Sequence, residues 1–293
     1  MNAIQPISIQ AIPAFNDNYI WIMTQGESAV VVDPGDAAPV LQYLQDKSLS
    51  LRAILVTHHH GDHVGGVKDL VKVYACPVYG PHNPKLDMID HRVQEGETVP
   101  LGQLLQAEHK HQAAKPTTEP GQQASLGLEE RGHELVLHVL EVPGHTLDHI
   151  AYTGVINGQQ TILFCGDTLF SCGSGRIFEG NSRMMLQSLD KFKKMPENTL
   201  IYCAHEYTLS NIKWAMAVES DNKAIQQWHE QAIQLRAEDR PTIPTNLGQE
   251  LRTNPFLRVN EPSVRQAAQQ FAGQELETPA EVLGALREWK NTF

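Results

Sequence analysis

The sequence has few features of exported, membrane-spanning or nucleic-acid-binding proteins. It contains only four cysteines, and the spacing of Cys76, Cys165, Cys172 and Cys203 matches no disulfide framework. No apolar run approaches the roughly 18 residues of a membrane-spanning helix, and the first residues lack the basic and apolar segments of a secretion signal. The net charge of −11 argues against a nucleic-acid surface, which usually needs a basic face. We therefore expect a cytoplasmic protein with reduced thiols that binds neither nucleic acid nor a membrane.

What the sequence does contain is a dense cluster of potential metal ligands at residues 57–63, directly after an apolar run that is typical of a buried strand. In an extended segment, side chains two residues apart point the same way, so His58 and His60 can bind one metal ion. Glycines then turn the chain, so Asp62 and His63 point elsewhere and can bind a second ion. Histidine and aspartate supply the nitrogen and oxygen ligands that suit zinc, iron or manganese.

The same pattern, an apolar run that ends in a potential ligand, recurs three times later in the chain. His145 follows the run 135–142, Asp167 follows the run 161–166, and His205 follows the run 200–204. Strands of an α/β sheet end together at one edge, where residues from several strands can form one site. Five histidines and two aspartates would converge there, which suits a centre with two metal ions and one shared carboxylate.

The order of these motifs resembles that of a known family. The histidine-rich segment, Pro143-Gly144-His145-Thr146, Gly166-Asp167-Thr168 and the late His205 together resemble the metallo-β-lactamase fold superfamily. Further motifs at 15–19, 32–35, 164–170, 203–207 and 253–258 narrow the resemblance to the hydroxyacylglutathione hydrolases, also called glyoxalase II. It covers nearly the whole chain and implies an α+β fold, in which a four-layer αββα sandwich is followed by a smaller all-α domain.

We place the boundary between these domains near residue 208. Residues 1–207 show the strand and helix alternation of packed α/β layers, and residues 208–293 show four helical patterns at 209–218, 222–237, 262–271 and 279–290. Residues 106–133 are polar, have no apolar periodicity and are predicted to form an insertion. His109 and His111 in this insertion mimic a ligand pair, but no strand precedes them, so we interpret them as part of a solvated loop.

The resemblance also implies how the ligands divide between two metal ions. His58, His60 and His145 would bind one ion, Asp62, His63 and His205 the other, and Asp167 would bridge them. The bridge suits a carboxylate, which has two oxygens, whereas an imidazole offers one free lone pair. Two ions about 3.5–4 Å apart lower the pKa of a bound water, so Asp62 and Asp167 are also the candidate catalytic residues. We expect zinc, with iron or manganese as alternatives. By resemblance Asp33 is an acid that supports the metal-binding loop, and a turn residue at the end of its strand is the equally weighted alternative.

The substrate implied by the resemblance is S-D-lactoylglutathione, which is cleaved to D-lactate and glutathione. The sequence has no signal for the oligomeric state, and a monomer is our expectation. The expected substrate contacts are Arg176, Phe178, Tyr207, Arg287 and Lys290. Arg287 and Lys290 lie three residues apart on one face of the predicted final helix, a spacing that is also typical of a solvated charge pair. Some family members have lysine and tyrosine at the positions of Arg176 and Phe178. The nearby segment 171–175 also departs from the usual Gly-Cys-Gly.

Three other functions are compatible with a metal-binding sandwich of this kind. A persulfide dioxygenase would use one iron and a glutathione persulfide, and the predicted helical domain with its Arg-x-x-Lys sequence argues against it. A nuclease is disfavoured by the acidic net charge. A non-catalytic metal-binding module is the third alternative, and only an activity assay after metal reconstitution separates it from a hydrolase.

Overall fold

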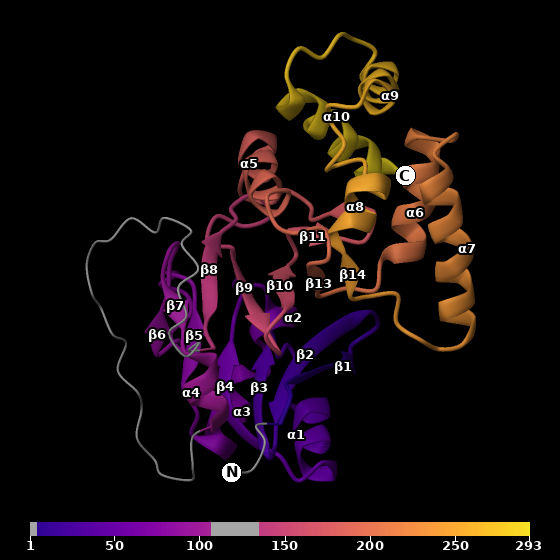
Figure 1. The fold of residues 1–293 in the computed structure, drawn as a ribbon. Coiled ribbons are helices and arrows are strands. Elements are labelled where there is room, and N and C mark those ends of the chain that lie inside the picture. The colour runs from indigo at the N-terminus through magenta and orange to yellow at the C-terminus, as the bar shows by residue number, and fades with distance from the viewer. Residues whose placement is uncertain (1–4, 107–134) are drawn as a thin grey trace.

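The computed structural model describes residues 5–106 and 135–293 (Figure 1). All of the predicted insertion except Gln106 and, with it, His109 and His111 lies outside these residues. No helix in the two described ranges is long and apolar enough to cross a membrane. The described chain forms two six-stranded sheets and a two-stranded sheet, with helices around them.

The first sheet has the strand order β1-β2-β3-β4-β5-β6. Its strands are β1 Ser8–Ala14, β2 Asn18–Gln25, β3 Ser28–Val32, β4 Ser50–Leu55, β5 Val78–Gly80 and β6 His91–Arg92. The first three strands pair antiparallel, and β3 through β6 pair parallel. Strands predicted at 7–12, 19–24 and 29–33 coincide with β1, β2 and β3 to within two residues.

Two helices cover the outer face of this sheet. The helices in this half of the chain are α1 Ala37–Asp46, α2 Gly61–Val64, α3 Val67–Tyr74 and α4 Leu101–Gln106. Val40 of α1 and Leu70 of α3 pack into one cluster with Ile22 and Ile54 of the sheet. The Asp36 side chain caps α1 by accepting a hydrogen bond from the Ala38 amide.

The second sheet has the order β14-β13-β10-β9-β8-β7. Its strands are β7 Thr98–Val99, β8 Leu137–Glu141, β9 Ile150–Ile156, β10 Gln160–Gly166, β13 Leu200–Cys203 and β14 Thr245–Asn246. All pairs are antiparallel except β10 with β13. The short strands β11 Leu169–Phe170 and β12 Gly173–Ser174 pair separately, and helix α5 Ser182–Phe192 follows them.

The two sheets pack face to face around the larger hydrophobic core. Along β2, Trp21 and Met23 point into this core, whereas Ile20 and Ile22 point to the helices outside, because successive side chains of a strand lie on opposite faces. From the second sheet, Val139 and Phe164 enter the same core, and helix α5 adds Met185, Leu189 and Phe192. The predicted sandwich of two sheets between helices is therefore confirmed.

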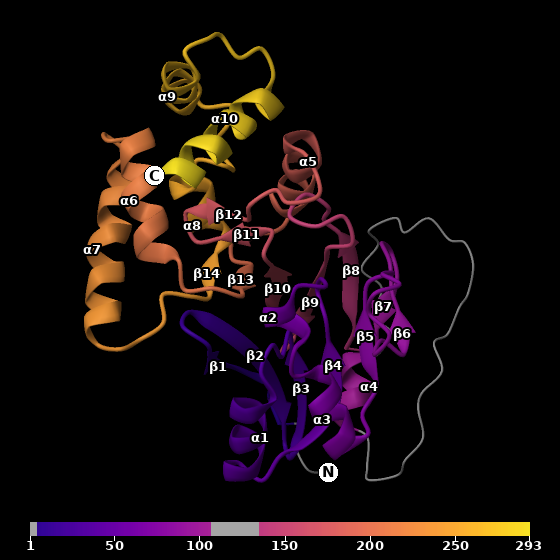
Figure 2. The same ribbon diagram turned by 180° about the vertical axis from the view of Figure 1, so that it is seen from behind.

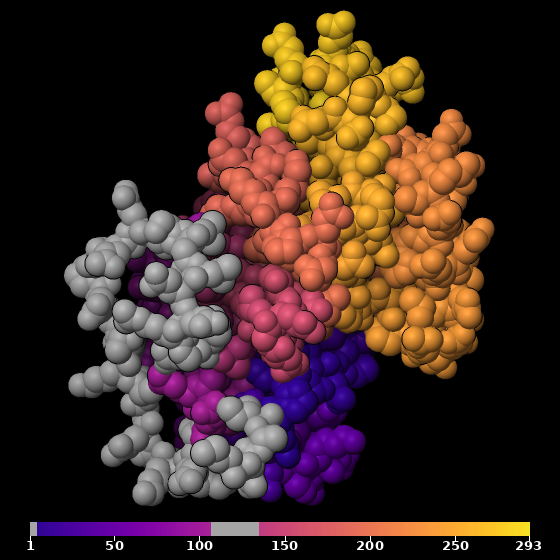
Figure 3. Space-filling model, viewed as in Figure 1, coloured from indigo at the N-terminus to yellow at the C-terminus, as the bar shows by residue number. Residues whose placement is uncertain are grey.

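The rest of the chain is helical and lies at one end of the sandwich (Figures 1 and 3). Its helices are α6 Thr208–Val218, α7 Lys223–Ala237, α8 Leu247–Thr253, α9 Pro262–Ala272 and α10 Pro279–Thr292. Four of them match the predicted helices to within two residues, whereas α8 and the strand β14 were not predicted. β14 pairs with β13, so this region also contributes to the second sheet, as Figure 2 shows from behind.

Candidate metal centre and its pocket

All seven predicted metal ligands lie together at the ends of four strands. The segment after β4 is extended up to His60 (φ −65°, ψ 145°), and the short helix α2 then points Asp62 and His63 in a new direction. His145, Asp167 and His205 follow β8, β10 and β13, respectively. The ligands arrange into two groups that share Asp167.

The first group contains three imidazole nitrogens that point at one another. His60 Nδ1 lies 3.1 Å from His58 Nε2 and 3.0 Å from His145 Nε2. Asp167 Oδ2 lies 3.4 Å from His145 Nε2. Together these four side chains offer ligand atoms within 4.8 Å of one another, and all except His60 are buried.

The second group forms around the other oxygen of Asp167. Oδ1 lies 3.4 Å from His63 Nε2 and 3.3 Å from His205 Nε2. Asp62 Oδ2 lies 3.5 Å and 3.4 Å from the same two nitrogens and accepts a hydrogen bond from the Asn18 amide. The two oxygens of Asp167 thus face different groups, as a bridging carboxylate requires.

The ligand atoms of the two groups are better placed to bind metal ions than to form hydrogen bonds with one another. His63 Nε2 and Asp167 Oδ1 are fully buried and have no hydrogen-bond partner in the described structure, and leaving such groups unpaired costs about 1–3 kcal/mol each. The convergent atoms are imidazole nitrogens and carboxylate oxygens, which are the ligands of zinc and related ions. Both observations indicate two adjacent metal sites.

The remaining nitrogen of four of the five imidazoles is held by a second partner. His63 Nδ1 lies 3.0 Å from the Asp33 carboxylate, and His205 Nδ1 lies 2.7 Å from the Asp17 carboxylate. His145 Nδ1 donates to the Arg176 carbonyl at 2.7 Å, and His58 Nδ1 contacts the Thr57 hydroxyl at 3.0 Å. Such partners fix ring orientation and tautomer. Of them, only Asp33 was expected from the sequence.

His149 is a further buried histidine that the sequence analysis missed. Its Nε2 accepts a hydrogen bond from the Asp167 amide at 3.1 Å, and its ring stacks on His58 at 4.5 Å between centroids. Burial, with a contribution from His145, lowers the pKa of His149 to about 3, so the ring is a neutral acceptor. The only sequence signal was a second histidine four residues after His145.

The histidines of the two ligand groups differ in the direction in which their pKa values are shifted. Burial lowers the pKa of His58, and the neighbouring His63 and His149 lower it further. Burial would also lower the pKa of His205, but the carboxylates of Asp167 and Asp62 beside its Nε2 raise it to about 10. Burial opposes protonation of His63 as well, but the charges of Asp167 and Asp33 raise its pKa. Bound cations would displace protons from both rings.

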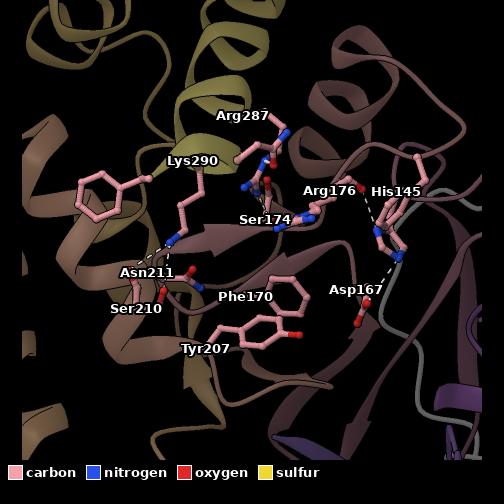
Figure 4. A pocket seen from close by; sticks show the side chains of 13 residues that line it. His145, Asp167, Phe170, Ser174, Arg176, Tyr207, Ser210, Asn211, Arg287 and Lys290 are labelled. Atoms are coloured by element: carbon pink, nitrogen blue, oxygen red, sulfur yellow. Dashed lines mark hydrogen bonds and ion pairs between the residues drawn. The ribbon is translucent and has the colours of Figure 1, made fainter. Parts of the chain in front are cut away.

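A cavity of about 540 Å³ opens from this centre towards the helical region (Figure 4). Its lining includes His145 and Asp167 at one end and Lys290 at the other, and it contains all five predicted substrate contacts. It also contains residues that the sequence analysis did not single out: Phe170, Ser174, Ser210, Asn211, Asn291 and Phe293. One pocket thus joins the metal ligands to a group of cations.

The three cations in the pocket differ in how they are held. The Arg176 side chain is exposed and pairs with no carboxylate in the described ranges. Lys290 Nζ donates to the Ser210 carbonyl at 3.1 Å. Arg287 is only 7% exposed and donates to the Ser174 carbonyl at 2.6 Å. A solvated charge pair, the alternative interpretation of the Arg287 and Lys290 spacing, is therefore wrong for Arg287.

The two aromatic contacts lie beside the metal ligands. Tyr207 stacks on His205 with ring centroids 4.7 Å apart, and burial, together with Asp17, raises the pKa of its hydroxyl. Phe178 is 62% exposed and places its ring edge against His60 and His145, at 5.6 Å and 5.3 Å between centroids. Phe178 therefore offers an apolar surface where a tyrosine would offer a hydroxyl.

Comparison with protein families divides the chain into two matched segments. Residues 14–205 match the metallo-beta-lactamase superfamily, and residues 206–293 match the family described as the hydroxyacylglutathione hydrolase C-terminus. Curated relatives named hydroxyacylglutathione hydrolase match almost end to end. The relative from Hahella chejuensis is 46% identical over 97% of this chain and 99% of its own length, and that from Nitrosomonas europaea is 42% identical over 98% and 97%.

Solved structures match at the level of the fold. ETHE1 from Myxococcus xanthus aligns with a TM-score of 0.56 over 98% of both chains, at 21% identity. The B3 metallo-beta-lactamase BLEG-1 aligns with a TM-score of 0.52 over 85% of this chain and 99% of its own, at 23% identity. Both likenesses concern the arrangement of sheets and helices described above.

Proposed function

Because this chain belongs to the hydroxyacylglutathione hydrolase family of the metallo-beta-lactamase superfamily, we propose that it cleaves S-D-lactoylglutathione to D-lactate and glutathione. A hydrolase of this family breaks the thioester bond of a hydroxyacyl glutathione. The observation that carries the proposal is the single cavity, which joins a two-group cluster of histidines and aspartates to three cationic side chains.

The centre is binuclear, and we assign its ligands as two sets with a shared carboxylate. One set is His58, His60 and His145, the other is Asp62, His63 and His205, and Asp167 bridges them. The proposed ions are zinc, and iron or manganese suit the same ligands, since the supply of metal selects among them. When bound, two such ions lower the pKa of a water molecule and polarise a carbonyl oxygen.

The chain's own residues orient the reacting groups. Asn18 donates a hydrogen bond to Asp62 Oδ2, which holds this carboxylate beside His63 and His205. His149 holds the Asp167 backbone, which keeps both carboxylate oxygens aimed at their separate groups. The leaving group is a thiolate, which is stable enough that the pocket needs no strong general acid beside it.

The cationic end of the cavity suits the glutathione moiety, which carries carboxylates at both ends. Arg176, Arg287 and Lys290 line this end, and they stand out on a chain with a net charge of −11. Arginine offers a planar fork to a carboxylate, and lysine a point charge. Tyr207 and Phe178 line the same cavity and pack against ligand histidines, where they would contact the thioester portion.

We further propose that the enzyme is a monomer in the cytoplasm. The four cysteines are free and buried, as expected for a protein from a reducing compartment. A molecular mass in solution close to 32.6 kDa would support the monomer. A mass near twice that value would contradict it.

The proposed function is tested by metal analysis together with a hydrolysis assay on the same purified sample. We expect about two metal ions per chain and rapid cleavage of S-D-lactoylglutathione, with much slower cleavage of a small thioester that lacks glutathione. One ion per chain without thioester cleavage would overturn the proposal, as would equal rates on both thioesters.

A further inference from the structure

A short backbone segment connects the cationic end of the pocket to the metal centre. The segment 174–176 begins at Ser174, the last residue of β12, and lies against two of the proposed ligands, Asp167 and His145. A side chain added at Gly175 would come within 1.9 Å of the Asp167 carbonyl and 3.0 Å of His145 Nδ1. The next carbonyl, that of Arg176, accepts the hydrogen bond from His145 Nδ1. Any displacement of this segment therefore moves the partner that orients His145.

Arg287 holds the other end of the same segment. Its guanidinium donates from Nη1 to the Ser174 carbonyl at 2.6 Å and from Nε to Asn291 at 3.1 Å, and it lies over the Phe256 ring. No carboxylate in the described ranges pairs with it. A buried cation without a counter-ion is costly unless it is well hydrogen-bonded, so its bond to the Ser174 carbonyl is its main anchor in the fold.

We propose that Arg287 is a positioning residue for the metal centre in addition to a substrate contact. By holding the Ser174 carbonyl, it fixes the segment that presents the Arg176 carbonyl to His145. That carbonyl can only accept, so the proton stays on His145 Nδ1 and the lone pair of Nε2 points at the first group of ligands. The inference rests on the proposed function, because it takes His145 as a metal ligand.

Lys290 provides a matched control for this role. It lies on the same helix α10, lines the same cavity and carries the same charge as Arg287. Its ammonium group, however, bonds to Ser210 of α6, and none of its hydrogen bonds reaches the segment 174–176. Removing Lys290 thus removes a pocket cation without releasing the segment, which separates an effect of charge from an effect of position.

The test measures metal release, and it needs no substrate. Wild type, Arg287→Met, Arg287→Lys and Lys290→Ala are loaded with zinc and mixed with excess chelator, and the release of each ion is followed in time. Loss of a hydrogen-bond partner of a metal ligand weakens metal binding about 10–100-fold. Arg287→Met keeps that partner and only releases the segment that carries it, so we expect one of the two ions to leave up to about tenfold faster, with the second ion near its wild-type rate.

The control variants sharpen this result. Methionine keeps an unbranched stem over Phe256, so Arg287→Met should fold, which circular dichroism checks. Arg287→Lys retains one donor for the Ser174 carbonyl and should recover part of the slow release, whereas Lys290→Ala should release both ions as wild type does. Unchanged release from folded Arg287→Met would overturn the inference, and so would equally fast release from Lys290→Ala.

Failure of the inference can be told apart from failure of the proposed function. If wild type cleaves S-D-lactoylglutathione but Arg287→Met retains both ions, only the positioning role is lost. If wild type binds two ions, shows the predicted release contrast and does not cleave the thioester, the positioning role stands and the substrate assignment falls.

Discussion

The two ends of the pocket are built on different principles. At the metal end, side chains follow the ends of four strands, are mostly buried and are oriented by a second hydrogen bond on the far side of the ring. At the cationic end, the side chains come from a loop and from helix α10, and their burial ranges from exposed Arg176 to buried Arg287. The positions of the metal ligands follow from the strands that precede them in the sequence. The positions of the cationic side chains depend on how helix α10 packs against the rest of the chain.

This difference predicts different kinetic consequences. Substitutions at the metal end should remove metal and lower kcat, because they act on the reacting groups. Substitutions at the cationic end should mainly raise KM, because carboxylate contacts far from the thioester are made equally in the ground state and the transition state. Arg287 is the expected exception, since it lines the cationic end and also holds the segment that presents the Arg176 carbonyl to His145.

The largest effect is expected for Asp167→Ala. The substitution removes both oxygens that face the two ligand groups, so metal content should fall towards one ion or none. Activity should fall by more than the roughly 100-fold that loss of a ligand's hydrogen-bond partner costs. Metal analysis and a thioester assay measure both quantities. Two tightly bound ions with near-normal turnover would show that Asp167 does not bridge.

A smaller effect is expected for Asp33→Asn. Asp33 accepts hydrogen bonds from the Thr57 amide and hydroxyl and contacts His63 Nδ1 at 3.0 Å. The amide keeps the shape but loses the charge that holds His63, so metal affinity should fall about 10–100-fold. Titration against a competing chelator measures this change. KM for the thioester should stay near its wild-type value, and a rise in KM alone would contradict the distinction between the two ends.

Lys290→Ala should raise KM for the glutathione thioester with little change in kcat. A hydrogen bond to a charged group contributes about 1.5–3 kcal/mol, which corresponds to a rise of about tenfold or more. A small thioester without glutathione serves as the control and should be cleaved equally by both forms. An unchanged KM for the glutathione thioester would mean that Lys290 makes no substrate contact.

The same lysine predicts a pH dependence. Burial, together with the charges of Arg287 and Arg176, lowers the pKa of Lys290 to about 8. Its charge is therefore complete below neutral pH and is lost as pH rises through about 8, so KM should rise in alkaline solution. Lys290→Arg should flatten that rise, because arginine remains charged. A profile that is identical in wild type and Lys290→Arg would assign the rise to another group.

The smallest effect is expected from deleting residues 107–131 and closing the chain with a short Gly-Ser turn. The Gly102 amide donates to the Leu135 carbonyl at 2.7 Å, so the flanking segments already lie side by side. Each doubling of loop length changes the closure cost by only about 0.6 kcal/mol. Thioester hydrolysis should be nearly unchanged. A large fall in activity in a folded variant would give the insertion a role at one of the two ends.

The metal end could be predicted from the sequence because its ligands follow apolar runs that form strands. His145, Asp167 and His205 each follow such a run, and β8, β10 and β13 run in the same direction, so their carboxyl ends lie at one edge of the second sheet. The partners of these ligands could not be predicted in the same way. Asp17, the partner of His205, lies in a turn. The partner of His145 is the backbone carbonyl of Arg176, which a residue of any type would supply.

The cationic end was predicted from the family resemblance, but the burial of its side chains was not. Three-residue spacing places Arg287 and Lys290 on one face of α10 in any helix. Which of them becomes buried depends on the elements packed against that face, here Phe256 and the β12 strand. Strand β9 and helix α5 were not predicted, although the sequence carries a signal for both: β9 is a mainly apolar run, and Met185, Leu189 and Phe192 of α5 have helical spacing.

The short strand β14 bears on how relatives of this chain could be recombined. The two family segments meet between residues 205 and 206, yet β14 covers the outer edge of β13, and the Leu247 and Gly248 amides bond back to Thr199 and Glu197. A chain cut at that junction would leave β13 as an open edge, which invites self-association. A chimera that exchanges the helical segment must therefore bring a matching edge strand with it, or the catalytic half will aggregate before it can bind metal.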